Sequence, residues 1–156
     1  MEAIVSDIMN YGEIAVLHFT KGHNCAQATA LAFAPDYGLD DATVLCAMAG
    51  FGAGMGGLRE TCGAVSAMVY VAGLHTGGYL PSDNAAKKAL YELVREMVGQ
   101  FSDEHGTTCC RELLKKAACF PKTDPSERTA QYYAVRPCAR FVASAARIIE
   151  KTLQNS

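Results

Sequence analysis

Apolar residues recur along this chain at intervals of three and four positions, which is the spacing of one face of an α-helix. We find no convincing run with the alternation of apolar and polar residues that is typical of a half-buried strand. The clearest helix follows Pro81 and carries charged residues around an apolar face, which is formed by Leu90, Leu93, Val94, Met97 and Phe101. The pattern therefore predicts an all-α fold.

Glycine, proline and N-cap residues divide this pattern into about six helices. In the first helix, Ile4, Ile8, Ala15 and Phe19 share one face, and Gly12 is a candidate kink. The later helices are expected to start near Asn24, Asp40, Thr61, Pro81, Cys109 and Pro137. A polar connection around Pro121, Asp124 and Pro125 precedes the last helix, and we expect it to be the most flexible segment.

Length and composition favour one domain. The chain has 156 residues, of which 50% are hydrophobic and 19% charged, so it is long enough to bury a core and too apolar to be disordered. We therefore expect residues 1–156 to form a single compact helical bundle.

Charge and hydropathy exclude several classes of partner. The formal net charge of −2 gives no positive field for a nucleic acid. The longest nearly apolar run, Val65 to Leu74, is about half the length that spans a bilayer, so we expect no membrane insertion. The first residues carry Glu2 and Asp7 without a basic region, which does not resemble a signal peptide. We therefore expect a cytoplasmic protein.

Cysteine usage is the unusual feature, because seven cysteines occur in 156 residues. In the cytoplasm they are expected to be thiols, metal ligands or redox catalysts rather than structural disulfides. Most of them stand at predicted helix starts, namely Cys25, Cys62, the pair Cys109 and Cys110, and Cys138. The first turn of a helix stabilises a thiolate, so we expect lowered pKa values there. Cys46 and Cys119 are interpreted as packing residues.

The spacing of the cysteines excludes several known motifs. No CxxC pair is present, so a zinc ribbon, a thioredoxin motif and a CxxCH haem site are not expected. Any common site must be assembled by the fold. Side chains of Cys109 and Cys110 would diverge by about 100° on a helix, so only one of the two is expected to face such a site.

Five segments in order resemble the C_GCAxxG_C_C family of redox-active proteins, over nearly the whole chain. They are residues 24–27 (NCAQ), 50–54 (GFGAG), 62–67 (CGAVSA), 110–114 (CRELL) and Cys138. By this resemblance the matching cysteines are Cys25, Cys62, Cys110 and Cys138, with Cys110 preferred to Cys109 because it directly precedes Arg111. One departure is Ala67, which stands where the last glycine of the motif would fall.

The resemblance implies a redox or metal site with four cysteines and a redox partner protein. A similar domain precedes the haem-binding part of split-Soret cytochromes, where an iron–sulfur centre has been proposed. Our preferred interpretation is that Cys25, Cys62, Cys110 and Cys138 bind an iron–sulfur cluster, most simply [2Fe–2S], for electron transfer or redox sensing. A dithiol–disulfide oxidoreductase and a structural zinc site remain alternatives, and no haem is expected. Glycine-rich loops and alanine-rich helices would also permit two copies to pack as a homodimer.

Other motifs are interpreted more conservatively. Residues 52–57 satisfy GxGxxG, but a helix is predicted before them, so we expect a flexible or tightly turned loop rather than a dinucleotide site. The histidines are interpreted as surface or helix-end residues, the alternative for His23 and His75 being an extra ligand or a proton carrier. Charged and aromatic residues also adjoin the cysteines: Arg59, Glu60, Arg111, Tyr132, Tyr133 and Arg136. We interpret Arg59, Glu60 and Arg111 as a solvated face, the alternative being that they tune thiolate charge or bind an anion. We expect Tyr132, Tyr133 and Arg136, which precede Cys138, to shield the site.

Overall fold

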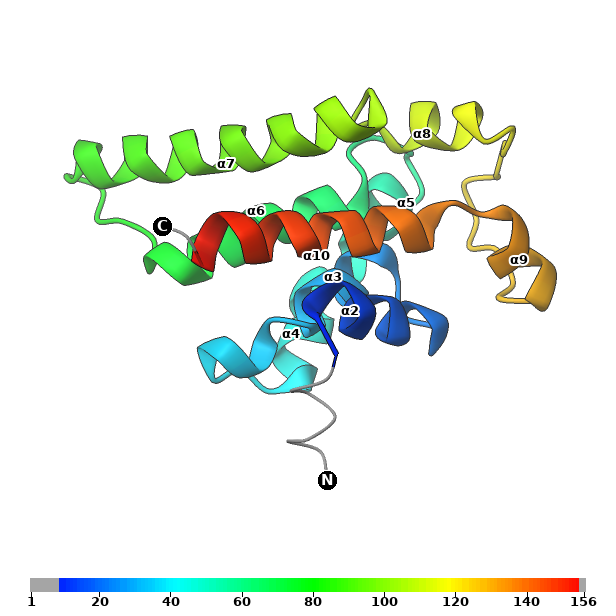
Figure 1. Cartoon of the computed structure of the whole chain (residues 1–156), viewed down its shortest axis with the longest axis horizontal. Helices are drawn as coiled ribbons and strands as arrows, with labels where there is room; N and C mark the ends of the chain where they lie inside the picture. The colour runs from blue at the N-terminus through cyan, green and yellow to red at the C-terminus, as the bar shows by residue number, and fades with distance from the viewer. Residues whose placement is uncertain (1–8, 155–156) are drawn as a thin grey trace.

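The structure is a computed structural model, and it describes residues 9–154. Over these residues the chain is all-α (Figure 1): no strand forms, and the one isolated β-bridge joins Thr61 to Cys109. The predicted fold class is confirmed, and the number of helices is close to that expected. No described helix is long and apolar enough to cross a membrane.

The helices follow one another with short connections. In chain order they are α2 (Tyr11–Thr20), α3 (Cys25–Leu31), η1 (Ala34–Tyr37), α4 (Asp41–Met48), η2 (Ala49–Phe51), α5 (Gly52–Met55), α6 (Gly63–Thr76), α7 (Asn84–His105), α8 (Cys110–Lys116), α9 (Ala130–Val135) and α10 (Cys138–Gln154).

The C-terminal helix α10 runs through the middle of the bundle. It contacts α2 and α3 on one side and α6 and α7 on the other (Figure 1). Its buried stripe of Phe141, Val142, Ala145, Ile149 and Leu153 joins a core with large fully buried side chains, among them Phe19, Met68, Met97 and Phe101. This arrangement brings the starts of α3, α6, α8 and α10 to one end of the bundle, around a single cavity.

The first helix and the polar connection differ in part from what the sequence predicts. Gly12 does not kink a helix within the described residues, because α2 begins just before it, after the N-cap Asn10, and Gly12 packs against the backbone of Ala143 in α10. Ile4 and Ile8 lie outside the described residues. The polar connection after Pro121 contains a helix that we did not predict, α9, which begins after the N-cap Thr129.

The glycine-rich segment, predicted to be a flexible or tightly turned loop, forms a tight turn. From Ala53 to Gly57 every backbone φ angle is positive, between 56° and 84°, so α5 is a left-handed turn and not a regular α-helix. Three of these five residues are glycines, which adopt this conformation without strain. Helices α4 and η2 precede the turn, and the chain continues from the turn to Cys62.

Candidate functional site

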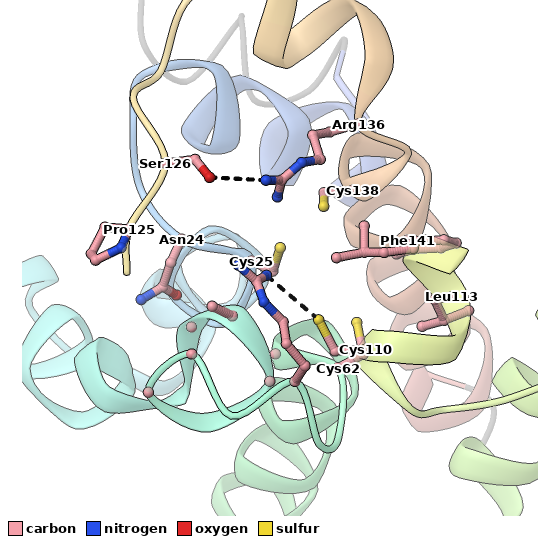
Figure 2. Close-up of a pocket in the computed structure, with 18 of the residues that line it drawn as sticks. Asn24, Cys25, Cys62, Cys110, Leu113, Pro125, Ser126, Arg136, Cys138 and Phe141 are labelled. Carbon is pink, nitrogen blue, oxygen red and sulfur yellow. Dashed lines mark hydrogen bonds between the residues drawn. The ribbon is translucent and has the colours of Figure 1, made fainter. Parts of the chain in front are cut away.

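Four helix starts present one cysteine each to a common cavity (Figure 2). Cys25, Cys110 and Cys138 are the first residues of α3, α8 and α10, and Cys62 is the N-cap of α6. The start of α3 is fixed by a capping box, in which the side chain of Asn24 accepts a hydrogen bond from the backbone of Gln27 and the Gln27 side chain accepts one from Asn24. The structure therefore brings all four predicted cysteines together.

The cavity has a volume of about 330 Å³. Phe141, Leu113, Leu114 and Tyr132 supply apolar walls, and Cys62 and Cys138 are only 4% and 8% exposed. The charged residues that line it are Arg59, Arg128 and Arg136, and no described carboxylate lines it. Thiols and guanidinium groups therefore share one largely apolar space.

The other three cysteines lie outside this cavity. The thiol of Cys109 lies 3.4 Å from the backbone oxygen of Arg59, to which it donates a hydrogen bond, so Cys110 is the member of the pair that faces the cavity. Cys119 is partly buried and donates to the backbone oxygen of Val135. Cys46 is exposed on α4, so its predicted role in core packing is wrong: its position in the helix faces solvent although its sequence neighbours are apolar.

Cys25 and Cys138 form a hydrogen-bonded pair with opposite pKa shifts. The pKa of Cys138 is lowered to about 7, because the Cys25 thiol donates a hydrogen bond to its sulfur; burial opposes this, and the positive charges of Arg136, Arg128 and Arg59 assist it. The pKa of Cys25 is raised well above its ordinary value by the same hydrogen bond, by burial and by the negative charge of neighbouring thiolates. The pair therefore carries one negative charge, with Cys138 as the thiolate and Cys25 as the thiol.

Burial overrides the helix-start effect at the other two cysteines. Desolvation raises the pKa of Cys62 to about 12, although the backbone N–H groups of Ala64 and Val65 act in the opposite direction. Desolvation also raises the pKa of Cys110, against a hydrogen bond from Arg59 and its positive charge. The expectation that every helix start lowers the cysteine pKa is therefore wrong for Cys25, Cys62 and Cys110. At Cys25 the hydrogen bond to Cys138 is the largest cause of the raised pKa, and at Cys62 and Cys110 desolvation is the largest cause.

Arg59 joins the glycine-rich turn to the thiols. Its Nη1 lies 3.8 Å from the sulfur of Cys110, and its Nη2 donates to the backbone oxygen of Lys122 at 3.0 Å. The side chain is only 9% exposed, and its backbone φ is 58°, a conformation that a residue with a side chain rarely adopts. Arg59 is therefore part of the cavity wall and not of a solvated face, which corrects the interpretation made from the sequence.

A segment that we call the strap, residues 121–136, covers one side of the cavity. The guanidinium carbon of Arg128 lies 4.7 Å from the ring centroids of both Phe19 and Tyr132, and its Nη2 donates to the backbone oxygen of His23. The guanidinium carbon of Arg136 also lies 4.7 Å from the ring centroid of Tyr132. Its Nη2 donates a hydrogen bond to the hydroxyl of Ser126 at 2.9 Å (Figure 2). Tyr132 and Arg136 therefore line the cavity as shielding residues.

Arg128 is a cavity residue that the sequence did not single out. Its only signal in the sequence is the nearby pair of tyrosines, and its contact with Phe19 depends on the packing of the strap against α2. Conversely, the histidines take no part in the cavity: His75 contacts the hydroxyl of Tyr37 at 3.1 Å, and His23 lies beside the ring of His18. This placement agrees with their interpretation as helix-end residues.

Close backbone approaches around the cavity require glycine. A Cβ atom on Gly54 would lie 2.7 Å from the Cβ of Cys110 and from the backbone of Arg59 and Glu60. A Cβ on Gly63 would lie 3.0 Å from the backbone of Ala26 and Phe51. The glycines therefore allow the turn and the starts of α3, α6 and α8 to meet.

The described donor side chains are not grouped as the ligands of a single metal ion. Within residues 9–154, no group of three or more His, Cys, Asp or Glu side chains lies close enough together to hold one. The four thiols nevertheless interact electrostatically, since thiolates at Cys138 and Cys110 raise the pKa values of both Cys25 and Cys62. They surround a shared space rather than one point.

Comparison with known proteins gives a family match for most of the chain. No curated protein and no solved structure matches it. The model of the family described as "Putative redox-active protein (C_GCAxxG_C_C)" matches residues 23–152, a range that contains all four cavity cysteines. This chain therefore belongs to the C_GCAxxG_C_C family of redox-active proteins.

Proposed function

We propose that this redox protein holds an iron–sulfur cluster, [2Fe–2S], on Cys25, Cys62, Cys110 and Cys138, and uses it for electron transfer or redox sensing. The observation that carries the proposal is the cavity itself, in which thiols from four separate helix starts meet three guanidinium groups and no described carboxylate. When bound, such a cluster would accept or release one electron at a time.

The donor set fits this group. Four cysteine thiolates are the usual ligands of a [2Fe–2S] cluster, and the cavity offers four thiols with no described histidine among its lining residues. Largely apolar walls, including Phe141 and Leu113, would keep water away from the sulfurs.

The charges fit it as well. A cluster held by four thiolates is anionic, and Arg59, Arg128 and Arg136 would offset part of that charge. Without a metal, the hydrogen bond to Cys138 together with burial keeps Cys25 protonated at neutral pH, and burial keeps Cys62 protonated. Binding of iron would supply the positive charge that these thiols need in order to ionise.

A structural zinc site has less support. Zinc needs its ligands around one point at tetrahedral spacing, and the described side chains offer no such group. The same observation bears on a cluster, so analysis of bound iron and zinc decides between the two metals.

A second candidate function, disulfide exchange, is favoured by the pair Cys25 and Cys138. With a pKa of about 7, Cys138 is substantially thiolate at neutral pH. Its sulfur would attack a disulfide of a partner protein and release one partner thiolate. Cys25, after losing its proton, would then attack the mixed disulfide, form a Cys25–Cys138 disulfide and release the second partner thiol. The pair would lose two electrons, and the partner would gain them.

One preparation distinguishes these functions. The protein is purified without oxygen, and its visible spectrum, iron, acid-labile sulfide and zinc are measured on the same sample. Iron and sulfide in equal amounts, with colour that fades on reduction, would support the cluster. A protein that stays colourless after attempted cluster reconstitution and forms a Cys25–Cys138 disulfide on oxidation would support exchange. Stoichiometric zinc without redox activity would contradict both.

A further inference from the structure

Three positively charged side chains line the cavity, whereas its thiols are neutral when they are protonated. Arg59, Arg128 and Arg136 line it, and none of them forms an ion pair with a carboxylate among residues 9–154. The ion pairs found in this part of the chain, Lys88–Glu92 and His105–Glu104, lie outside the cavity lining. Three unpaired guanidinium groups in a protein of formal net charge −2 concentrate positive potential in one place.

Arg59 also has an unused hydrogen-bond donor. Its Nη1 and Nη2 contact Cys110 and the backbone oxygen of Lys122, but its Nε is buried without a hydrogen-bond partner. The residue as a whole is 91% buried, since only 9% of it is exposed. Buried donors nearly always have an acceptor, so a water molecule or a bound ligand would supply the one that the chain itself does not.

The cavity that Arg59 lines is large enough for a small molecule. The cavity volume of about 330 Å³ falls within the range of roughly 300–1,000 Å³ that is typical of small-ligand sites. Ser126, whose hydroxyl contacts Arg136, adds a polar group to the wall formed by the strap. The thiols and the positively charged arginines therefore line the same cavity.

We propose that this cavity is a binding site for a small oxyanion, either a carboxylate or a sulfur oxyanion. An oxygen of the anion accepts a hydrogen bond from Arg59 Nε, and Arg128 and Arg136 offset its charge. The anion then lies in the same cavity as the thiols, where a substrate or co-ligand of a redox centre would be placed. This inference goes beyond the proposed function, because it requires neither a cluster nor disulfide exchange.

Calorimetric titration of the purified chain with sodium thiosulfate and with sodium acetate tests the site. The buffer contains no carboxylate or sulfonate, and the metal-free and the iron-reconstituted protein are both titrated. We expect one anion to bind at one site per chain, and the tighter of the two identifies its class. Arg59→Gln should weaken binding by about tenfold or more, because a charge-assisted hydrogen bond is lost. Arg95→Gln, on the exposed side of α7, is the matched control and should bind normally.

Three results would overturn the inference. They are the absence of saturable binding by either anion at millimolar concentration, equal affinity in the wild type and in Arg59→Gln, and binding that is lost once a cluster is installed. Loss of anion binding after a cluster is installed would mean that the cluster, and not an anion, accepts the hydrogen bond from Arg59 Nε. Far-UV circular dichroism checks that Arg59→Gln is folded, and if it is not, Arg136→Gln replaces it with the same expected weakening. A protein that takes up no cluster but binds the anion would refute only the proposed function.

Discussion

Cys25 and Cys138, the first residues of α3 and α10, hydrogen-bond each other through their sulfurs although they stand near opposite ends of the chain. Packing of α10 against α3 creates this contact. It holds a thiol of raised pKa beside a thiolate of lowered pKa. The contact therefore links the tertiary fold directly to the ionisation of the site.

The alkylation rate of Cys138 should depend on pH with a midpoint near 7. The thiolate is the reactive form and is populated above the pKa, so in reduced, metal-free protein the rate should rise as pH increases through about 7. Cys62 should stay unreactive over this range, because its pKa is raised to about 12. Mass spectrometry of iodoacetamide-labelled peptides measures both rates.

The same experiment on Cys25→Ala tests the cause of the shift. Removal of the donor thiol should move the Cys138 midpoint upward, toward the ordinary value for cysteine, whereas the control Cys119→Ala should leave it unchanged. A midpoint near 9 in the wild type, or no change in Cys25→Ala, would contradict the described contact.

Gly54→Ala should destabilise the protein and displace Cys110. The new Cβ would lie 2.7 Å from the Cβ of Cys110, and the backbone φ of 66° strains any residue with a side chain. We expect a loss of about 1–3 kcal/mol in the free energy of unfolding, measured by urea denaturation. Gly99→Ala in α7, where a Cβ would meet nothing within 4 Å, should instead be neutral or stabilising by up to about 1 kcal/mol. Equal effects of the two substitutions would refute this role of Gly54.

Arg128→Ala should loosen the strap while leaving the bundle folded. The substitution removes the stacking on Phe19 and Tyr132 and the hydrogen bond to His23, together worth about 1–3 kcal/mol. Hydrogen exchange of the amides in α9 should therefore become faster by about tenfold or more, with little change in α6 or α10. Arg95→Ala serves as the control. Unchanged exchange in α9 would show that Arg128 does not hold the strap.

Local sequence signals predicted the helices and the positions of the cysteines well. The predicted N-cap Asn24 is the observed one, with its capping box to Gln27, and Cys138 follows Pro137 at the start of α10. These features depend on a few neighbouring residues, so a single sequence contains them. Helix geometry predicted that only one of Cys109 and Cys110 faces the site, and the preference for Cys110, which came from the resemblance to the family motif, agrees with the cavity lining.

Long-range packing accounts for what the sequence did not reveal. The burial of Arg59, the contact of Arg128 with Phe19 and the raised pKa of Cys62 all depend on segments that meet only in the folded chain. Cys46 shows the opposite error, because apolar neighbours in sequence do not decide which face of α4 is covered.

The central claim is that four specific cysteines form one redox centre, and replacing each cysteine by serine tests it most directly. Iron and acid-labile sulfide per chain are measured after anaerobic reconstitution of each variant. We expect Cys25→Ser, Cys62→Ser, Cys110→Ser and Cys138→Ser to lose or destabilise the cluster, and Cys46→Ser, Cys109→Ser and Cys119→Ser to retain it. Equal iron and sulfide in all seven variants, or loss in Cys109→Ser with retention in Cys110→Ser, would contradict the account.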